Sequence, residues 1–443
     1  MIKKRICCQE NEADKIIIYG GRSLQGKIVV SGAKNAVLPI IVASLLSEGT
    51  CTIQDVPRLA DVEIICDVLR ELGAGIKLNM KDSSAIIETN CQELYNYEAT
   101  YNYVKKMRAS VLVMGPLLAR LGKAKISMPG GCAIGTRPID LHLKGFEALG
   151  VHITMEHGYI LAEAPVLKGA RIYLDYPSVG ATENIMMAGA LAQGTTIIEN
   201  SAEEPEIVDL ANFINSMGGK IVGAGTKVIK IEGVKSLGST NHTVIPDRIE
   251  AGSFLVAGAI TGGDLFLENV IIDHLKPVVA KLIEAGVDVA EEGTGLRVRS
   301  KGEFKAIDLK TLPYPGFPTD MQAQFMSLLA VAQGTSIISE TVFENRFMHA
   351  EELRRMGANI RIEGRSAVIE GTEKLTGAQV KASDLRAGAA LAIAGLVAEG
   401  ETVISNIYHL DRGYDNLVAK LYSVGANIMR VKNCDRLILA SKA

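Results

Sequence analysis

A sixfold repeat constrains the fold of this 443-residue chain more than any other feature of its sequence. The repeated motif is an apolar residue, a glycine four positions later, and Ile or Val three positions after that. Its glycines are spaced by 77, 68, 68, 71 and 68 residues: Gly73, Gly150, Gly218, Gly286, Gly357 and Gly425. A glycine that closes an apolar periodic segment is typical of a helix end. The motif therefore predicts six units, each with an amphipathic helix followed by a strand.

A second glycine precedes each of these by 23 to 28 residues and follows a more apolar segment: Gly49, Gly122, Gly194, Gly263, Gly334 and Gly400. Helices that are apolar on every side must be enclosed by other elements. We therefore expect an α/β protein with two domains of three units each, in which sheets enclose the apolar helices. Gly, Ser, Thr and Asn cluster at 232–247, where we expect the chain to pass from the first domain to the second.

Composition and charge exclude several classes of protein. Residues are 48% apolar and 22% charged, which is ample for large hydrophobic cores. The formal net charge of −3 and the short apolar runs predict no nucleic-acid partner and no membrane span. Seven widely spaced cysteines, with no C-x-x-C pair and no secretory signal, favour a reducing cytoplasm and argue against a metal site.

The apolar helices are predicted to begin with charged residues. Counting back 14 or 15 positions from the glycine that ends each helix gives Lys34, Arg108, Gly180, Arg248, Asp320 and Arg386. A cation at a helix N-terminus is locally unfavourable, because the free N–H groups and the helix dipole attract anions. The four cations are explained either by a polyanion bound in a cleft or by ordinary salt bridges. For the set as a whole we favour the polyanion.

Further arginines follow the glycine-led strands: Arg58, Arg137, Arg346 and Arg412. Arginine suits bidentate contact with phosphate or carboxylate, which supports an anionic ligand. Asp320 is the acidic exception among the helix starts. Its carboxylate is either a structural counter-ion or a general base that the neighbouring cations keep ionised.

Unit two departs from the repeat at 128–142, which reads MPGGCAIGTRPIDLH. Its glycines permit unusual backbone angles and close approach to a ligand. Cys132, five residues before Arg137, can therefore have a lowered pKa and a reactive thiolate. The alternative is a surface loop with an incidental cysteine. Because the repeat is broken only here, we interpret this segment as a lid over the anion site.

Ten motifs in the chain resemble those of the UDP-N-acetylglucosamine enolpyruvyl transferases (1-carboxyvinyltransferases), within the enolpyruvyl transferase family. The resemblance extends from about residue 16 to the C-terminus. One departure is at 175–177, where some members carry a lysine that contacts the nucleotide. The motifs are SGAKNA (31–36), MRAS (107–110), PGGCAIGTRPIDLH (129–142), SVGAT (178–182), EPEIVD (204–209), PDRIE (246–250), FPTDMQAQ (317–324), TVFENRFMH (341–349), DLRA (384–387) and YHLDRGY (408–414).

The resemblance implies a fold of two inverse α/β barrel domains, each built from three repeats. The N-terminal domain would be 34–245 and would carry the cysteine loop. The C-terminal domain would be 16–33 plus 246–443, and 1–15 would be an extension. The implied reaction transfers enolpyruvyl from phosphoenolpyruvate to the 3′-hydroxyl of UDP-N-acetylglucosamine and releases phosphate. This is the first committed step of peptidoglycan synthesis, in the cytoplasm, and it needs no metal, cofactor or obligate protein partner.

The resemblance also implies roles for individual residues. Cys132 would be the proton donor that also forms a covalent phosphoenolpyruvate adduct. Asp320 would contact the nucleotide sugar, and its carboxylate among cations makes it our candidate for the base. Lys34 and Arg412 would complete the catalytic set. Contacts to the two substrates would come from Lys34, Asn35, Arg108, Arg137, Pro138, Ile139, Asp140, Leu141, Ser178, Val179, Gly180, Asp320, Val342, Arg386 and Arg412.

Two alternatives remain open at the level of sequence. The acceptor could be shikimate 3-phosphate, which the related shikimate-pathway enzyme uses, although 137–141 (RPIDL) argues against it. The chain could also bind UDP-N-acetylglucosamine as a scaffold without catalysis. Every position needed for catalysis is filled, which argues against this second alternative.

The role of Cys132 can be tested with an epoxide. We expect Cys132→Ser to lose the covalent adduct and to resist thiol-alkylating epoxides such as fosfomycin, because a serine hydroxyl is not ionised near neutral pH. Mass spectrometry of wild type and variant after incubation with the epoxide measures both effects. Alkylation of the variant within 128–142 would show that Cys132 is the wrong residue.

Overall fold

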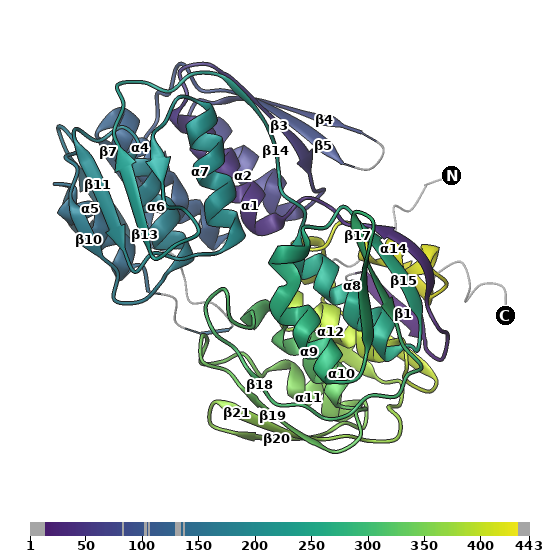
Figure 1. Ribbon diagram of the computed structural model, residues 1–443. Coiled ribbons are helices and arrows are strands. Elements are labelled where there is room, and N and C mark those ends of the chain that lie inside the picture. Colours follow the sequence, from purple (N-terminus) through teal and green to yellow (C-terminus); the bar gives the residue numbers. More distant parts are fainter. Residues whose placement is uncertain are drawn as a thin grey trace, which may run out of the picture.

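The computed structural model describes residues 14–81, 84–101, 104, 107–128, 134–135 and 138–432. The described chain forms two halves that lie against each other (Figure 1). One half is built mainly from the first part of the chain, and the other from the second part together with the first two strands. No described helix is long and apolar enough to cross a membrane.

Six amphipathic helices end where the repeat predicts. Each stops two residues before a repeat glycine, and all six glycines have positive φ angles between 90° and 108°. An L side chain is strained in this conformation, so glycine lets the chain leave the helix and enter the next strand. The predicted helix ends are therefore confirmed. The helices are α2 (Ala60–Glu71), α5 (Asp140–Ala148), α7 (Pro205–Ser216), α9 (Lys276–Glu284), α11 (His349–Arg355) and α14 (Leu417–Ser423).

Six further helices are buried along almost their whole length. They are α1 (Lys34–Ala43), α4 (Met114–Leu121), α6 (Val179–Gly189), α8 (Arg248–Ile260), α10 (Gln322–Leu329) and α12 (Leu385–Gly395). Short 3₁₀ helices lead into two of them, at Arg108–Val113 before α4 and Thr319–Met321 before α10. All six residues predicted at helix starts occupy the first or second position of these elements.

Each half contains three separate four-stranded sheets. In all six sheets one edge strand is parallel to its neighbour and the remaining pairings are antiparallel. In the first half the strand orders are β14-β3-β5-β4, β6-β7-β9-β8 and β10-β11-β13-β12. Their bounds are β3 (Thr50–Val56), β4 (Gly75–Met80), β5 (Ala85–Asn90), β6 (Glu98–Ala99), β7 (Lys123–Ser127), β8 (His152–Glu156), β9 (Tyr159–Glu163), β10 (Arg171–Tyr173), β11 (Thr195–Glu199), β12 (Ile221–Val222), β13 (Val228–Glu232) and β14 (Thr240–Thr243).

The second half repeats this arrangement with strands from both ends of the chain. Its strand orders are β16-β17-β15-β2, β18-β19-β21-β20 and β22-β23-β1-β24. The bounds are β1 (Lys15–Tyr19), β2 (Gln25–Val29), β15 (Asp264–Glu268), β16 (Asp288–Glu292), β17 (Gly295–Arg299), β18 (Leu309–Lys310), β19 (Thr335–Ser339), β20 (Asn359–Glu363), β21 (Ser366–Glu370), β22 (Gln379–Lys381), β23 (Glu401–Ser405) and β24 (Asn427–Val431). Strands β1 and β2 thus pair with strands more than 200 residues away.

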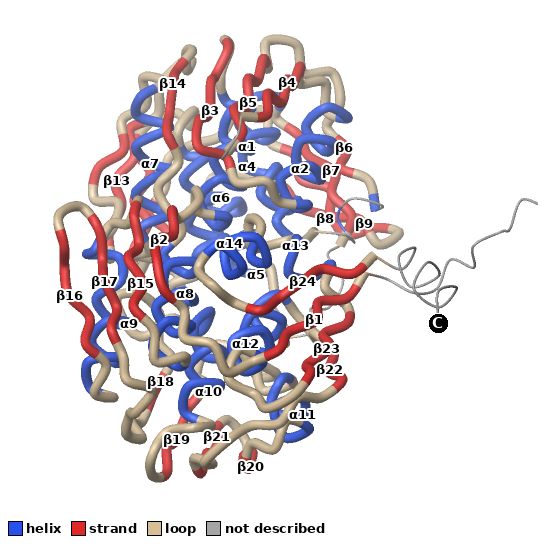
Figure 2. Tube along the Cα trace, turned by 90° about the vertical axis from the view of Figure 1, so that its right-hand side faces the viewer, coloured by secondary structure: helices blue, strands red, loops and turns tan. Residues whose placement is uncertain are grey.

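Three sheets enclose three apolar helices in each half (Figure 2). The sheets are not hydrogen-bonded to one another in the described chain, so each inverse barrel is an enclosure of sheets and not a closed cylinder of strands. Two hydrophobic clusters fill the halves, one from residues within 33–244 and one from residues within 16–30 and 249–428. The domain boundaries given above remain a prediction.

The chain crosses between the halves twice, and the two crossings lie side by side. The backbone N–H of Ala33 donates to Ile245 at 2.7 Å, and that of Asp247 donates to Ser31 at 2.8 Å. Gly32 and Pro246 form an isolated bridge between the two crossing segments. The helices that follow the crossings, α1 and α8, therefore begin close together at the junction of the halves.

Candidate active site

Lys34 and Arg412 lie on either side of one buried carboxylate, that of Asp61. Lys34 begins α1, Asp61 is in the first turn of α2, and Arg412 follows α13 (Tyr408–Asp411) in the other half. Asp61 Oδ2 is 2.9 Å from Lys34 Nζ, and Asp61 Oδ1 is 2.7 Å from Arg412 Nε. Two predicted catalytic cations, one from each half, therefore share a single counter-ion.

The electrostatics of Lys34 depend on this carboxylate. Burial is the main cause that lowers the pKa of the ammonium group. Asp61 opposes the effect, whereas the like charges of Arg386 and Arg412 reinforce it. The Lys34 backbone N–H donates to Asp247 Oδ2 at 3.1 Å, so the start of α1 is held as well.

Asp320 accepts hydrogen bonds from two arginines of its own half. Arg346 Nη2 is 2.8 Å from Asp320 Oδ1, and Arg386 Nη2 is 2.8 Å from Asp320 Oδ2. Asn35 Nδ2, from the first half, lies 3.5 Å from the same carboxylate. Burial alone would raise the pKa of Asp320, but Arg386, Arg346 and Arg248 together hold it well below its usual range. The carboxylate is thus ionised, as predicted, and in this structure it is the counter-ion of two arginines.

Arg386 retains unused hydrogen-bonding capacity. Its side chain is 2% exposed, and its Nε and Nη1 atoms have no hydrogen-bond partner among the described residues. The guanidinium lies 5.4 Å from the centre of the Tyr414 ring. A buried guanidinium with unpaired N–H groups is costly unless a ligand satisfies them.

Arg248 is paired with a carboxylate from the first half. Its Nε and Nη2 atoms lie 3.1 and 3.4 Å from the two carboxylate oxygens of Glu206, in the first turn of α7. Glu183, on α6, is buried near Glu206, and burial raises its pKa well above the ordinary value. Burial also raises the pKa of Glu204 to about 7. Among the described residues, salt bridges therefore account for Lys34 and Arg248 without a ligand, whereas Arg386 keeps two unpaired nitrogen atoms beside its bond to Asp320.

The predicted contact residue Val342 lies in a turn that Glu340 organises. Glu340 Oε1 accepts from the backbone N–H of Val342 at 2.8 Å and that of Phe343 at 3.2 Å. The other oxygen accepts from the hydroxyl of Thr319, next to Asp320, at 2.9 Å. This buried carboxylate thus connects the 341–343 turn to the segment that carries Asp320.

Ile134 and Gly135, the described part of the cysteine loop, contact residues 344–345, which directly follow this turn in the other half. The backbone N–H of Asn345 donates to the Ile134 carbonyl at 3.1 Å. Gly135 has φ +142°, and a Cβ atom there would lie 2.2 Å from Glu344 Oε2. Glycine is therefore favoured here by the backbone conformation, whereas the flexible Glu344 carboxylate could move away from an added Cβ atom. The loop extends across the junction at this point.

A second group of predicted residues surrounds the start of α6. Ser178 caps the helix by accepting the Ala181 N–H, and a Cβ atom on Gly180 would lie 3.2 Å from the His142 ring. His142 Nδ1 is 3.1 Å from Asn184 Nδ2. Burial, with help from Arg108, lowers the pKa of His142 to about 3, so its imidazole is neutral near pH 7.

Two of the predicted site residues, Cys132 and Arg137, lie outside the described residues. Of their neighbours, Pro138 is exposed, Ile139 is buried, and Asp140 and Leu141 begin α5. The remaining residues fall into the groups above, and their roles stay predictions. Sequence reasoning missed the acidic partners Asp61 and Glu206. Glu206 lies within a motif that carries the resemblance, whereas Asp61 has no signal beyond its place in a helix first turn.

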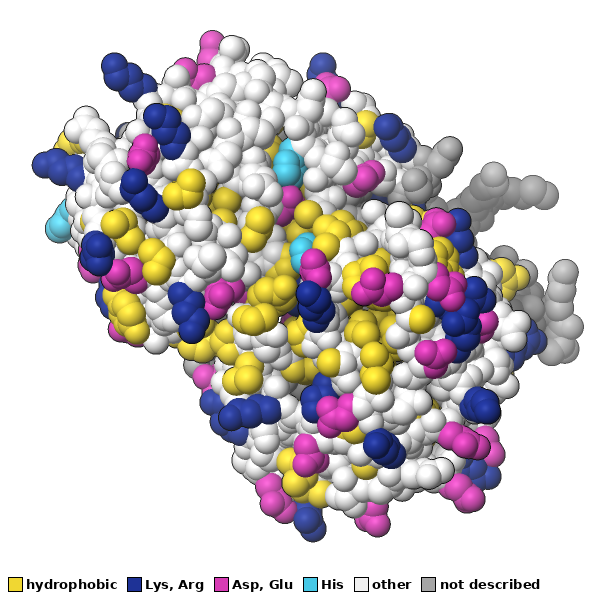
Figure 3. Space-filling model, in the orientation of Figure 1, with side chains coloured by type: hydrophobic (Ala, Val, Ile, Leu, Met, Phe, Trp, Pro, Cys, Tyr) yellow, Lys and Arg dark blue, Asp and Glu magenta, His cyan; other side chains and the backbone are white. Residues whose placement is uncertain are grey.

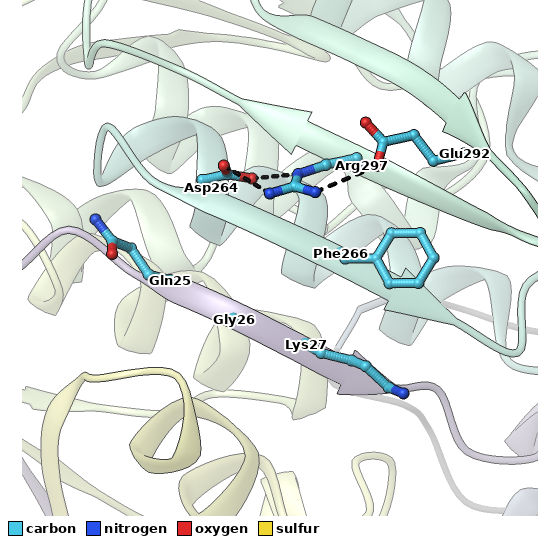
Figure 4. Close-up of a pocket in the computed structure, with 7 residues that line it drawn as sticks. All are labelled: Gln25, Gly26, Lys27, Asp264, Phe266, Glu292 and Arg297. Carbon is cyan, nitrogen blue, oxygen red and sulfur yellow. Dashed lines mark hydrogen bonds and ion pairs between the residues drawn. The ribbon is translucent and has the colours of Figure 1, made fainter.

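Hydrophobic, acidic and basic side chains meet at the junction of the halves (Figure 3). A cavity of about 760 Å³ lies elsewhere, on the β2-β15-β17-β16 sheet (Figure 4). Its charged lining is paired, with Arg297 bound to Asp264 and Glu292, and Lys27 bound to Glu268. A second cavity of about 500 Å³ lies beside α9 and β19. Neither is lined by a predicted site residue. No group of three or more potential metal ligands occurs among the described residues.

Comparison with solved structures supports the fold assignment. The enolpyruvyl transferase NikO from Streptomyces tendae superimposes with a TM-score of 0.86, covering 95% of this chain and 99% of that chain at 24% identity. EPSP synthase from Acinetobacter baumannii gives a TM-score of 0.74 at 20% identity, with 95% and 100% coverage. The family model of EPSP synthase (3-phosphoshikimate 1-carboxyvinyltransferase) matches residues 18–421. The molecule thus has the enolpyruvyl transferase fold.

Curated relatives define the family more closely. A UDP-N-acetylglucosamine 1-carboxyvinyltransferase 2 from Carboxydothermus hydrogenoformans is 61% identical over 422 residues, covering 95% of this chain and 100% of that protein. A UDP-N-acetylglucosamine 1-carboxyvinyltransferase 1 from Caldanaerobacter subterraneus is 61% identical over 416 residues, covering 94% and 99%. The chain belongs to the UDP-N-acetylglucosamine 1-carboxyvinyltransferase family of transferases, and the resemblance in its motifs is confirmed.

The raised pKa of Glu204 predicts a pH-dependent loss of stability. Its pKa of about 7 lies above the ordinary 4.5, so the folded state holds this proton more tightly than the unfolded state. Stability should therefore fall as pH rises from 4.5 to 7. Between pH 5 and 8 the free energy of unfolding of the wild type should fall by about 1–3 kcal/mol more than that of Glu204→Gln. Chemical denaturation at each pH measures the difference. Glu156→Gln, at an exposed site of the same half, is the control. Equal pH dependence in wild type and Glu204→Gln would refute this assignment.

Proposed function

We propose that this protein transfers the enolpyruvyl group of phosphoenolpyruvate to the 3′-hydroxyl of UDP-N-acetylglucosamine and releases phosphate. The observation that carries the proposal is the convergence of Lys34 and Asn35 with Asp320, Arg386 and Arg412 at the junction of the halves. Phosphoenolpyruvate carries a phosphate and a carboxylate, and the acceptor carries a diphosphate. Identity of about 60% to curated enzymes of that name supports this choice of substrates.

The cations supply charge for the anionic donor. In the proposed complex, Lys34 and Arg412 hold phosphate, and the unpaired Nε and Nη1 atoms of Arg386 donate to the donor's anionic groups. An anion bound to Arg386 would weaken the pull of that arginine on Asp320. The pKa of Asp320 would then rise toward a value suited to accept a proton.

Addition and elimination each require proton transfer. In the addition step, Cys132 donates a proton to C3 of phosphoenolpyruvate while the sugar 3′-oxygen attacks C2 and loses its proton to Asp320. In the elimination step, the C2–O bond to phosphate breaks and the proton held by Asp320 leaves with the phosphate. The Cys132 thiolate takes a proton back from C3, which restores the double bond as an enol ether. The nucleotide sugar is held by Arg108, by residues 137–141 and 178–180, and by Val342.

Closure of the 128–142 loop excludes water from the tetrahedral intermediate, which would otherwise hydrolyse. Contact between Ile134–Gly135 and the turn at 344–345 supports a loop that bridges the halves. We place the reaction in the cytoplasm, where it would begin peptidoglycan synthesis. The reduced, buried cysteines Cys51, Cys66 and Cys91 are consistent with that compartment. The only partners proposed are the two small-molecule substrates.

One assay tests the proposed function against its alternatives. Phosphate release from phosphoenolpyruvate is measured with UDP-N-acetylglucosamine, with shikimate 3-phosphate and without acceptor. We expect release with the nucleotide sugar alone. Release with shikimate 3-phosphate alone would assign the other acceptor. Binding of the nucleotide sugar without release in any mixture would identify a scaffold.

Asp320 should be required for chemistry more than for binding. We expect Asp320→Ala to reduce turnover at least about a thousandfold, because the sugar hydroxyl loses its base and two arginines lose their partner. Binding of UDP-N-acetylglucosamine, measured by calorimetry, should persist. Asp273→Ala, at an exposed surface site of the same half, is the control and should retain full activity. Near-normal turnover in Asp320→Ala would remove Asp320 from the role of base.

A further inference from the structure

Two segments from opposite halves meet through a reciprocal pair of ion pairs. Residues 58–61 lead into α2, and residues 412–415 follow α13. Arg58 pairs with Asp415, with Nε 3.4 Å from Oδ1 and the backbone N–H donating to Oδ2 at 3.0 Å. In the second ion pair the charges are exchanged, because the acid Asp61 belongs to the first segment and Arg412 to the second. Both carboxylates are 2% exposed, so neither is a solvated surface group.

Asp61 differs from Asp415 in what else it touches. Besides Arg412, it contacts the Lys34 ammonium, which is itself only 11% exposed. Lys34 and Arg412 would repel each other at this separation without an intervening negative charge. An ammonium has three N–H donors and a guanidinium five, so both cations keep donors for a second anion after binding Asp61.

We infer that Asp61 is a positioning residue, which holds Lys34 and Arg412 side by side and keeps Lys34 charged, so that one phosphate can engage both halves at once. The inference rests on the proposed function, since it assigns these two cations to the phosphate of the donor. Asp61 itself would not touch the reacting atoms. The Arg58–Asp415 pair keeps the two segments in register but does not reach Lys34.

The pH dependence of activity distinguishes this role of Asp61 from a purely structural one, because it reports the protonation of Lys34. The charged groups around its ammonium are Asp61, Arg386 and Arg412, and Asp247 accepts its backbone N–H. Of these, Asp61 is the carboxylate that raises the pKa of the ammonium group. Lys34 loses its charge as pH rises through its pKa, so loss of Asp61 must move that transition to lower pH.

The test compares Asp61→Asn with Asp415→Asn in the full-length enzyme. We measure kcat/KM for phosphoenolpyruvate against pH at saturating UDP-N-acetylglucosamine. In Asp61→Asn we expect the basic limb of the pH profile to move down by about one pH unit. This shift alone lowers kcat/KM about fivefold at the wild-type midpoint of the limb and about tenfold at higher pH. Asp415→Asn removes an equally buried carboxylate between the same two segments. In this variant the basic limb of the pH profile should lie at the same pH as in the wild type.

Every outcome of this comparison bears on the inference. Superimposable profiles for wild type and Asp61→Asn, or an equal shift in Asp415→Asn, would overturn it. If Asp61→Asn does not fold, Asp61→Glu replaces it. This variant keeps the charge but displaces the carboxylate, and we expect an unshifted basic limb with a lower kcat/KM. An unchanged kcat/KM in Asp61→Glu would overturn the inference too. Failure of the proposed function is separate, because wild type would then release no phosphate with UDP-N-acetylglucosamine.

Discussion

Enclosure of six apolar helices is the constraint on which the rest of this structure depends. A helix without a polar face, such as α8 or α12, cannot lie against water. In each half, three sheets surround three such helices and shield them from water. Because the units repeat, the sheets share one pattern, with a parallel edge strand and antiparallel neighbours. To complete the second enclosure the chain uses its first strands, and this requirement forces the two adjacent crossings at 30–33 and 244–247.

The crossings bring buried charge to the junction between the halves. Helices α1 and α8 begin there with Lys34 and Arg248, and these cations are balanced by Asp61 and Glu206. Lys34 and Asp61 belong to the same half, whereas the Glu206–Arg248 and Asp61–Arg412 pairs join the two halves even without a ligand. Removing one partner of such a buried ion pair would leave an uncompensated charge. Asp320 and Asp61 each face two cations, so each carboxylate is surrounded by more positive charge than it can neutralise. That excess is the physical basis for binding an anionic donor.

Much of the fold was predictable because it depends on local rules repeated six times. Helix ends at Gly73 or Gly286 follow from a positive φ that other residues avoid. Lys34, Arg248 and Arg386 were predicted at helix starts from spacing alone. The choice between salt bridges and a polyanion could not be made from spacing, because it depends on which acids lie nearby. Asp61 is in another helix from Lys34, and Arg412 is 351 residues farther along the chain than Asp61.

Sequence by itself determined the six units, the helix starts and ends, the family and the chemistry expected of its motifs. These follow from periodicity, backbone conformational preference and residue type, all of which are local. Only the tertiary structure decided which carboxylate meets which cation, that β1 and β2 complete sheets of the second half, and that Ile134 and Gly135 contact the 344–345 turn. Those contacts join residues of different elements, some of them hundreds of positions apart. Their energies depend on distance and burial that exist only once the chain has folded.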